Sequence, residues 1–267
     1  MKIKDETLGM WLGVLGVACF AITLPMTRLA TGTQAAPQLS PWFVTLARAA
    51  LAGGLSTVYL VVTRSPRPGR QHWKSLALTM LGTVIGYPLL LGYALRVVSA
   101  GHAAVITALL PLVTAAVAAW LLHQRARLGF WLCSVAGSAL VVLFSVLRAR
   151  QGGASFGFEW ADVLLVGAVF AASFGYIFGA KITPALGAER VICWVCVLAL
   201  PVTLPGALWL WPQHAVAASA WGGLLYVGVF SMWAGFFAWY RGLMLGGALR
   251  VSQVQLLQPF LSILAAI

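Results

Sequence analysis

Acidic side chains are scarce in this sequence, in which five Asp and Glu residues stand against 17 Lys and Arg residues. All charged residues together make up 8% of the 267 positions, whereas soluble domains carry about 25%. So low a fraction excludes a water-soluble globular domain, and 61% of the residues are hydrophobic. The composition is therefore typical of an integral membrane protein.

The five acidic residues also avoid the middle of every apolar segment. They are Asp5, Glu6, Glu159, Asp162 and Glu189. Proton- and sodium-coupled transporters usually keep a carboxylate within the membrane to bind the ion, so this absence argues against that coupling scheme. We expect Glu159 and Asp162 to mark the outer interface, and any transport to depend weakly or not at all on a proton gradient.

Cysteine is rare as well, and the four cysteines all fall inside apolar segments. Cys193 and Cys196 form a C-x-x-C pair, but a closed zinc site needs four ligands and nothing nearby completes the set. We interpret both as small packing residues. The sequence also lacks the H-E-x-x-H and G-x-S-x-G motifs of common hydrolases. We therefore expect no enzyme activity, no metal and no cofactor.

What the sequence does contain is nine long apolar segments of about 20 residues each. A helix of that length crosses a hydrocarbon core of about 30 Å, whereas a spanning strand needs only about ten residues of alternating polarity. The pattern predicts an all-α integral membrane protein with crossings at residues 8–30, 41–62, 76–95, 102–122, 128–147, 160–180, 191–211, 220–240 and from 247 onward.

The two halves of the chain share one plan. Residues 99–120 read SAGHAAVITALLPLVTAAVAAW, and about 148 residues later the chain reads GGALRVSQVQLLQPFLSILAAI, with Pro259 in the place of Pro111. Five segments separate corresponding points, and an odd number of crossings inverts the second half in the membrane. We interpret residues 1–150 as a first five-helix repeat and residues 151–267 as a second, inverted repeat that is truncated before its last helix. The plan predicts a tenth helix at about residues 276–295, beyond Ile267.

Basic residues lie mostly in the loops on one side of the predicted bundle. Twelve Lys and Arg residues fall on the side of the N-terminus and four on the other. Because cytoplasmic loops carry the excess of positive charge, we expect the N-terminus in the cytoplasm. The net charge of +12 thus indicates how the protein is oriented in the membrane. We expect the partners to be the lipid bilayer and a small-molecule substrate, without nucleic acid.

Small residues recur four positions apart within the apolar segments. Examples are Gly9 with Gly13 and Gly82 with Gly86. This spacing lets two helix backbones approach closely, and it predicts tight packing inside the bundle.

Three stretches resemble the EamA branch of the drug/metabolite transporter superfamily. They are FVTLARAALAGG, which contains Arg48, then GYALRVVSAGHAAVITALLPLVTAAVAAWLL, and WYRGLMLGGALRVSQVQLLQPFLSILAAI. The resemblance implies ten helices in two repeats, transport activity and a place in the bacterial inner membrane. The family commonly has Gly-Glu at the end of its fourth helix, where this chain has Leu122, His123 and Gln124. A role that this glutamate has in the family therefore cannot be assigned to this chain.

The residues beside the matched prolines are the first candidates for a substrate site. Gln255 and Gln258 lie three apart on one face, and Thr107 lies beside Pro111. A polar amide in hydrocarbon that has no partner costs several kcal/mol. The two amides therefore either face the substrate or bond neighbouring helices, and the sequence favours neither. We interpret Pro111 and Pro259 as hinges.

Three further side chains stand out for their depth. Arg48 lies about 10 Å into the bilayer from the outer face, counted from Pro41. It either attracts an anion into the cavity or is a structural arginine that reaches the outer surface or backbone carbonyls. The family motif favours the second role, because it holds an arginine here whatever the substrate. Tyr87 and Trp233 lie away from the membrane interfaces, where an O–H or N–H needs a partner. His102 is interpreted as a helix-end residue.

These observations together predict a secondary transporter, an exporter of small amphipathic metabolites such as amino acids or neutral aromatic compounds. Inverted repeats rock about one central site in such proteins. The expected substrate-binding residues are Gln255, Gln258, Thr107, Tyr87, Trp233 and Arg48. A lipid flippase or an intramembrane enzyme without transport activity is the alternative.

Overall fold

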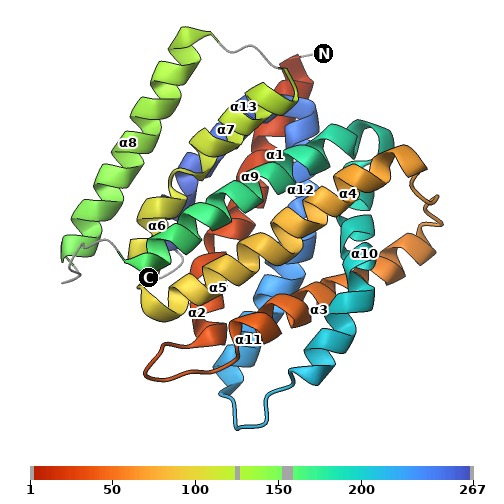
Figure 1. Cartoon of the computed structure of the whole chain (residues 1–267). Coiled ribbons are helices and arrows are strands. Elements are labelled where there is room, and N and C mark those ends of the chain that lie inside the picture. Colours follow the sequence, from red (N-terminus) through yellow and green to blue (C-terminus); the bar gives the residue numbers. More distant parts are fainter. Residues whose placement is uncertain (1–2, 124–126, 152–158, 265–267) are drawn as a thin grey trace.

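The computed structural model describes residues 3–123, 127–151 and 159–264, and these residues are almost entirely helical (Figure 1). Seven continuous helical stretches among them are long and apolar enough to cross a membrane. The helices α3, α9 and α10 are uninterrupted, at Pro41–Val62, Trp160–Leu186 and Ala188–Trp209. The predicted all-α architecture with two repeats is confirmed.

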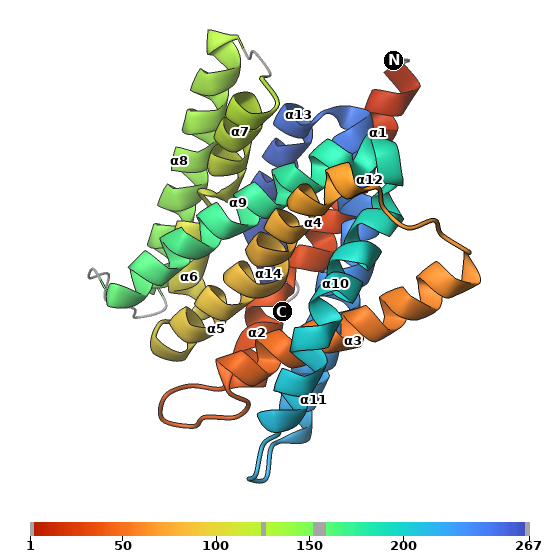
Figure 2. The same cartoon turned by 45° about the vertical axis from the view of Figure 1, so that its right-hand side comes forward.

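Several crossings are built from shorter pieces. The first comprises α1 (Ile3–Ala21) and α2 (Thr23–Thr31). The third comprises η1 (Arg70–His72), α4 (Trp73–Thr79), η2 (Met80–Gly86) and α5 (Tyr87–Val97), and the fourth comprises α6 (Ala100–Thr107) and α7 (Leu110–Leu121). The eighth comprises α11 (Ala218–Tyr226), η3 (Val227–Ala234) and α12 (Gly235–Gly246). The fifth, α8 (Leu128–Gln151), lies at the edge of the bundle in both views (Figures 1 and 2).

The ninth segment differs from the single helix expected from residue 247 onward. It consists of α13 (Ala248–Ser252), the 3-10 helix η4 (Gln253–Leu257) and α14 (Gln258–Leu264). The fourth segment is likewise broken between Thr107 and Leu110. Proline lacks a backbone N–H and its ring clashes with the preceding turn, so Pro111 and Pro259 each stand near the start of a new helix.

The interruptions of the helices occur at corresponding places in the two repeats. The segments η2 and η3 are both π-helical, and they lie at corresponding places in the third and eighth crossings. Gly86 and Gly235 stand at the ends of these segments, where an added Cβ would lie 2.8 Å from the carbonyl oxygens of Leu81 and Phe230, respectively. Because π-helical turns are often found at functional sites, the matched pair points to the middle of these two crossings.

Packing between the halves is also pairwise symmetric. The helix α3 packs against its counterpart α10, while α1 packs along α12 and the third crossing packs along α9 (Figures 1 and 2). A Cβ on Gly9 would lie 2.3 Å from the backbone nitrogen of Gly246, and one on Gly82 would lie 2.9 Å from the Cα of Gly175. The glycine spacing therefore does produce close helix packing within the bundle.

Candidate functional site

A cavity lies where the irregular parts of four crossings meet. Its space amounts to about 320 Å³, solvent-open space included, of which about 10 Å³ admits the centres of water molecules. Irregular backbone at membrane depth occurs where it is buried in protein or lines a water-filled cavity. The lining side chains come from both repeats and are Phe20, Thr23, Arg48, Thr83, Tyr87, Tyr176, Ser231, Met232, Phe236 and Gln258.

Arg48 supplies the charge of this cavity. Its residue is 2% exposed, so the guanidinium does not reach the outer surface of the protein. Its Nη2 donates to the hydroxyl of Ser231 at 3.1 Å, and that hydroxyl lies 2.8 Å from the Oγ1 of Thr23. The Nε has no hydrogen-bond partner among the described residues. One nitrogen of the guanidinium group is thus hydrogen-bonded, while its Nε lacks a partner among the described residues.

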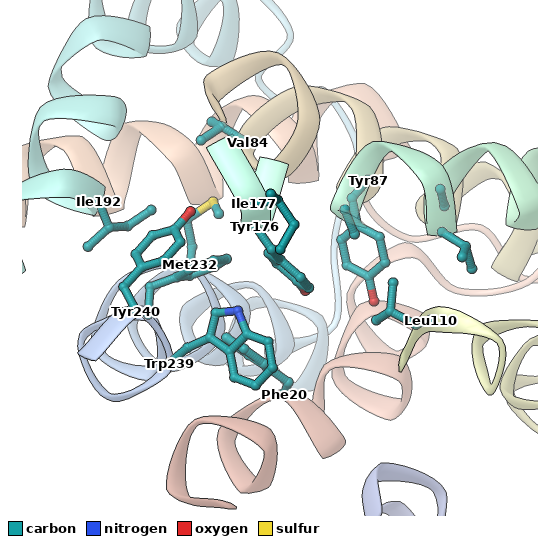
Figure 3. Packing of buried hydrophobic residues seen from close by; sticks show 14 of the residues in the cluster. Phe20, Val84, Tyr87, Leu110, Tyr176, Ile177, Ile192, Met232, Trp239 and Tyr240 are labelled. Atoms are coloured by element: carbon teal, nitrogen blue, oxygen red, sulfur yellow. The ribbon is translucent and has the colours of Figure 1, made fainter. Parts of the chain in front are cut away.

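Aromatic rings form the apolar side of the same cavity. The ring of Phe20 stacks on that of Tyr176 with centroids 6.3 Å apart, and Phe236 lies 5.1 Å from Phe20 and 5.8 Å from Tyr176. Figure 3 shows Tyr176 between Tyr87 on one side and Tyr240 on the other. The cavity therefore combines one cation, several hydroxyls and an aromatic surface.

A second small cavity adjoins the first through Gln258, which lines both; its space is about 230 Å³ with solvent-open space included, of which about 10 Å³ admits the centres of water molecules. Thr107 and Gln255 lie on its walls, together with Pro259. Gln255 is 3% exposed, and neither atom of its amide has a hydrogen-bond partner among the described residues. Gln258 is 9% exposed and its Nε2 donates to the carbonyl of Phe20 at 3.4 Å.

The two cavities contain residue pairs that the repeat relates. Thr83 and Ser231 are hydroxyl residues at corresponding places, and Tyr87 corresponds closely to the aromatic Phe236. The second cavity holds the polar pair Thr107 and Gln255. A site built in this way lies between the two repeats. Arg48 has no charged counterpart, because the corresponding position in α10 is near Cys196.

Comparisons with known proteins agree with this architecture. The sequence matches the EamA-like transporter family twice, over residues 7–146 and 159–267. The chain belongs to the EamA-like transporter family. It is 40% identical to the uncharacterized transporter YdeK of Bacillus subtilis (strain 168) over 265 residues, which cover 98% of this chain and 89% of YdeK. One solved crystal structure shares the fold with a TM-score of 0.72 at 18% identity, covering 96% of this chain and 88% of that one.

The structure of this EamA transporter brings five of the six expected site residues to the two cavities. Tyr87 and Arg48 line the first, Thr107 and Gln255 line the second, and Gln258 lines both. Trp233 lies outside both linings. Its ring instead packs 4.8 Å from Phe237 and 6.4 Å from Tyr59, measured between centroids.

Two ion pairs that were not expected from the sequence join the two repeats of this EamA transporter. Asp162 lies 2.6 Å from the Nε2 of His102, so that the start of α9 is joined to α6. Glu6 lies 2.8 Å from the Nη1 of Arg250, so that α1 is joined to α13. His102 and Arg250 occupy corresponding places in the repeat. Each pair therefore connects one repeat to the other, and the inverted plan puts the two pairs at opposite ends of the bundle.

Proposed function

We propose that this EamA transporter is a secondary transporter that exports small amphipathic metabolites, such as amino acids or neutral aromatic compounds. The observation that carries the proposal is the lining of the first cavity, where hydroxyls, an amide and one arginine face aromatic rings. Ligand sites commonly combine an apolar wall with a few well-placed polar groups in this way.

Alternating access is the mechanism that the symmetry supports. The cavity lies between the repeats, and the crossings around it carry matched interruptions that can act as points of bending. The pair Asp162–His102 joins α9 to α6 at one end of the bundle, and the more exposed pair Glu6–Arg250 joins α1 to α13 at the other. We propose that rocking of the repeats breaks these two pairs in turn. Pro111 and Pro259 then serve as hinges.

The narrowness of the cavity supports the same mechanism. Only about 10 Å³ admits the centres of water molecules, which is room for about one water. A metabolite of ten or more heavy atoms cannot occupy that space until the repeats separate. Entry of such a substrate therefore requires the two repeats to move apart, as the proposed mechanism provides.

The proposed setting is a bacterial inner membrane with the N-terminus in the cytoplasm. The distribution of basic residues supports the orientation, and the resemblance to the drug/metabolite transporter superfamily supports the membrane. Ion coupling is proposed to be weak, because the five acidic residues are absent from the linings of both cavities. Substrate would then leave the cell down its own gradient.

Counterflow in proteoliposomes tests the proposed function. Vesicles that contain the purified protein are loaded with one unlabelled amino acid or aromatic compound at a time, and the same labelled solute is added outside. Saturable accumulation of at least one solute, absent from protein-free vesicles, is the expected result. Lipid scrambling or product formation without exchange of any solute would contradict it and support a flippase or an enzyme.

A further inference from the structure

Arg48 is an uncompensated cation inside a membrane-spanning bundle. A buried charge is strongly unfavourable unless it is paired with an opposite charge and fully hydrogen-bonded. The ion pairs among the described residues use Asp162, Glu189 and Glu6, and none of them involves Arg48. The neutral hydroxyl of Ser231 is the recorded partner of its guanidinium, and the Nε bonds to no described residue.

A second arginine of the chain shows the contrasting, structural arrangement. Arg28 donates from its Nη1 to the carbonyl oxygens of Leu95 and Val98, at 2.8 and 2.6 Å, and so ties α2 to the end of α5. Arg48 makes no such recorded bond to a carbonyl among the described residues. Its side chain lines the cavity instead. A purely structural role therefore leaves its position and its open Nε unexplained.

We propose that the transported substrate carries a single carboxylate, and that this carboxylate binds the guanidinium of Arg48. The inference rests on the proposed transport function and narrows its substrate class to small amphipathic monoacids. The planar fork of arginine matches the two oxygens of a carboxylate. Arg48 is the one cationic side chain that the described residues contribute to the lining of the first cavity. Binding of a substrate with one negative charge is therefore favoured over binding of a dianion.

The remaining groups of the two cavities fit the rest of such a molecule. The rings of Phe20, Tyr176 and Phe236 offer an apolar surface beside the guanidinium. At the far end, the amide of Gln255 has both a donor and an acceptor without a partner among the described residues. A solute that bears a carboxylate at one end, an apolar middle and a second polar group satisfies all three regions.

Pairs of ligands that differ only in charge test the inference. The probes are N-acetyl-L-phenylalanine, N-acetyl-L-leucine and 3-phenylpropionate, each compared with its neutral primary amide. Binding to the detergent-purified full chain is followed by thermal shift and by titration of tryptophan fluorescence. We expect the wild-type protein to bind the acids about 10- to 100-fold more tightly than the amides, the factor for hydrogen bonds to a charged group.

Variants of Arg48 separate binding from structure. Arg48→Gln should abolish the preference for acids by lowering their affinity to that of the amides, while Arg48→Lys should retain part of the preference. Arg28→Gln is the matched control: it removes a structural arginine and should keep the preference at its wild-type value. If Arg48→Gln does not fold, the acid and amide affinities of the wild-type and Arg48→Lys proteins still decide the question.

Three outcomes overturn the inference. Equal binding of acids and amides by the wild-type protein would show that Arg48 does not select an anion, and so would absence of binding by every acid. An equal loss of affinity for acids and for amides in a folded Arg48→Gln variant would assign Arg48 a structural role. These outcomes leave transport of other solutes standing, because that is measured separately by counterflow. Absence of counterflow with every solute, whatever its charge, would contradict the proposed function instead.

Discussion

Replacing Gln255 by Leu should have opposite effects on stability and on substrate binding. The side chain is 3% exposed, and both of its amide atoms lack a hydrogen-bond partner among the described residues. An unsatisfied buried polar group costs about 1–3 kcal/mol. Leucine has a similar size and no polar atom, so the substitution should remove that cost and raise the unfolding temperature.

Substrate binding should weaken in the same variant. If the amide makes one or two hydrogen bonds of about 1 kcal/mol each to the substrate, their loss lowers the affinity roughly five- to thirty-fold. Gln258→Leu should also weaken binding, but without the gain in stability, because that amide already donates to the carbonyl of Phe20. Thermal shift with and without a transported solute measures both quantities on one sample.

A neighbouring glutamine provides the control. Gln253 belongs to the same 3-10 helix, lines neither cavity and donates to the carbonyl of Pro111 at 3.4 Å. Its replacement by Leu should leave the substrate affinity unchanged. The reasoning is refuted if Gln255→Leu lowers the unfolding temperature and keeps normal affinity, since the amide would then bond helix to helix.

Further predictions concern packing, closure, orientation and coupling. Gly9→Ala puts a Cβ 2.3 Å from a backbone nitrogen and should destabilise the protein by about 1–3 kcal/mol, whereas Gly54→Ala, with open space around it, should not; urea- or heat-induced unfolding in detergent compares them. Asp162→Asn should weaken closure of its end of the bundle, measured as faster labelling from outside of a cysteine that replaces Thr107; an unchanged rate counts against that role. A cysteine in place of Arg70 should resist an impermeant maleimide added to intact cells, and labelling there would reverse the orientation. An uncoupler should leave most transport intact in proteoliposomes with substrate charge controlled, and complete loss would contradict the proposed weak coupling to protons.

Much of the fold could be predicted because hydrophobic length and repetition are local properties of a sequence. Nine apolar runs, each near the length that spans a bilayer, predict the crossings, and the offset from Pro111 to Pro259 predicts two repeats. The same prolines locate the breaks in the fourth and ninth segments. The π-helical segments could not be foreseen, because 80–86 and 227–234 contain no proline, and an isolated glycine such as Gly82 or Gly228 does not distinguish a π-helical turn from a regular helix.

The site could be predicted only in part, for a similar reason. Depth follows from counting along one helix, so Thr107, Gln255 and Gln258 were found at the level of the cavities. Rotation of one helix against another depends on side-chain packing that a single sequence does not reveal. Trp233 therefore lies against Tyr59 and Phe237 instead of in either cavity lining, and the bond between His102 and Asp162 escaped notice.

The most direct test asks whether the cavity between the repeats is the place through which substrate passes. A cysteine replaces Thr107 in a protein whose four native cysteines are changed to alanine or serine, and the protein is reconstituted in vesicles. Alternating access predicts labelling by an impermeant maleimide from either side of the membrane, protection by a solute that shows counterflow, and loss of flux once the cysteine is modified. Labelling from one side only, without protection and with normal flux afterwards, would contradict the account.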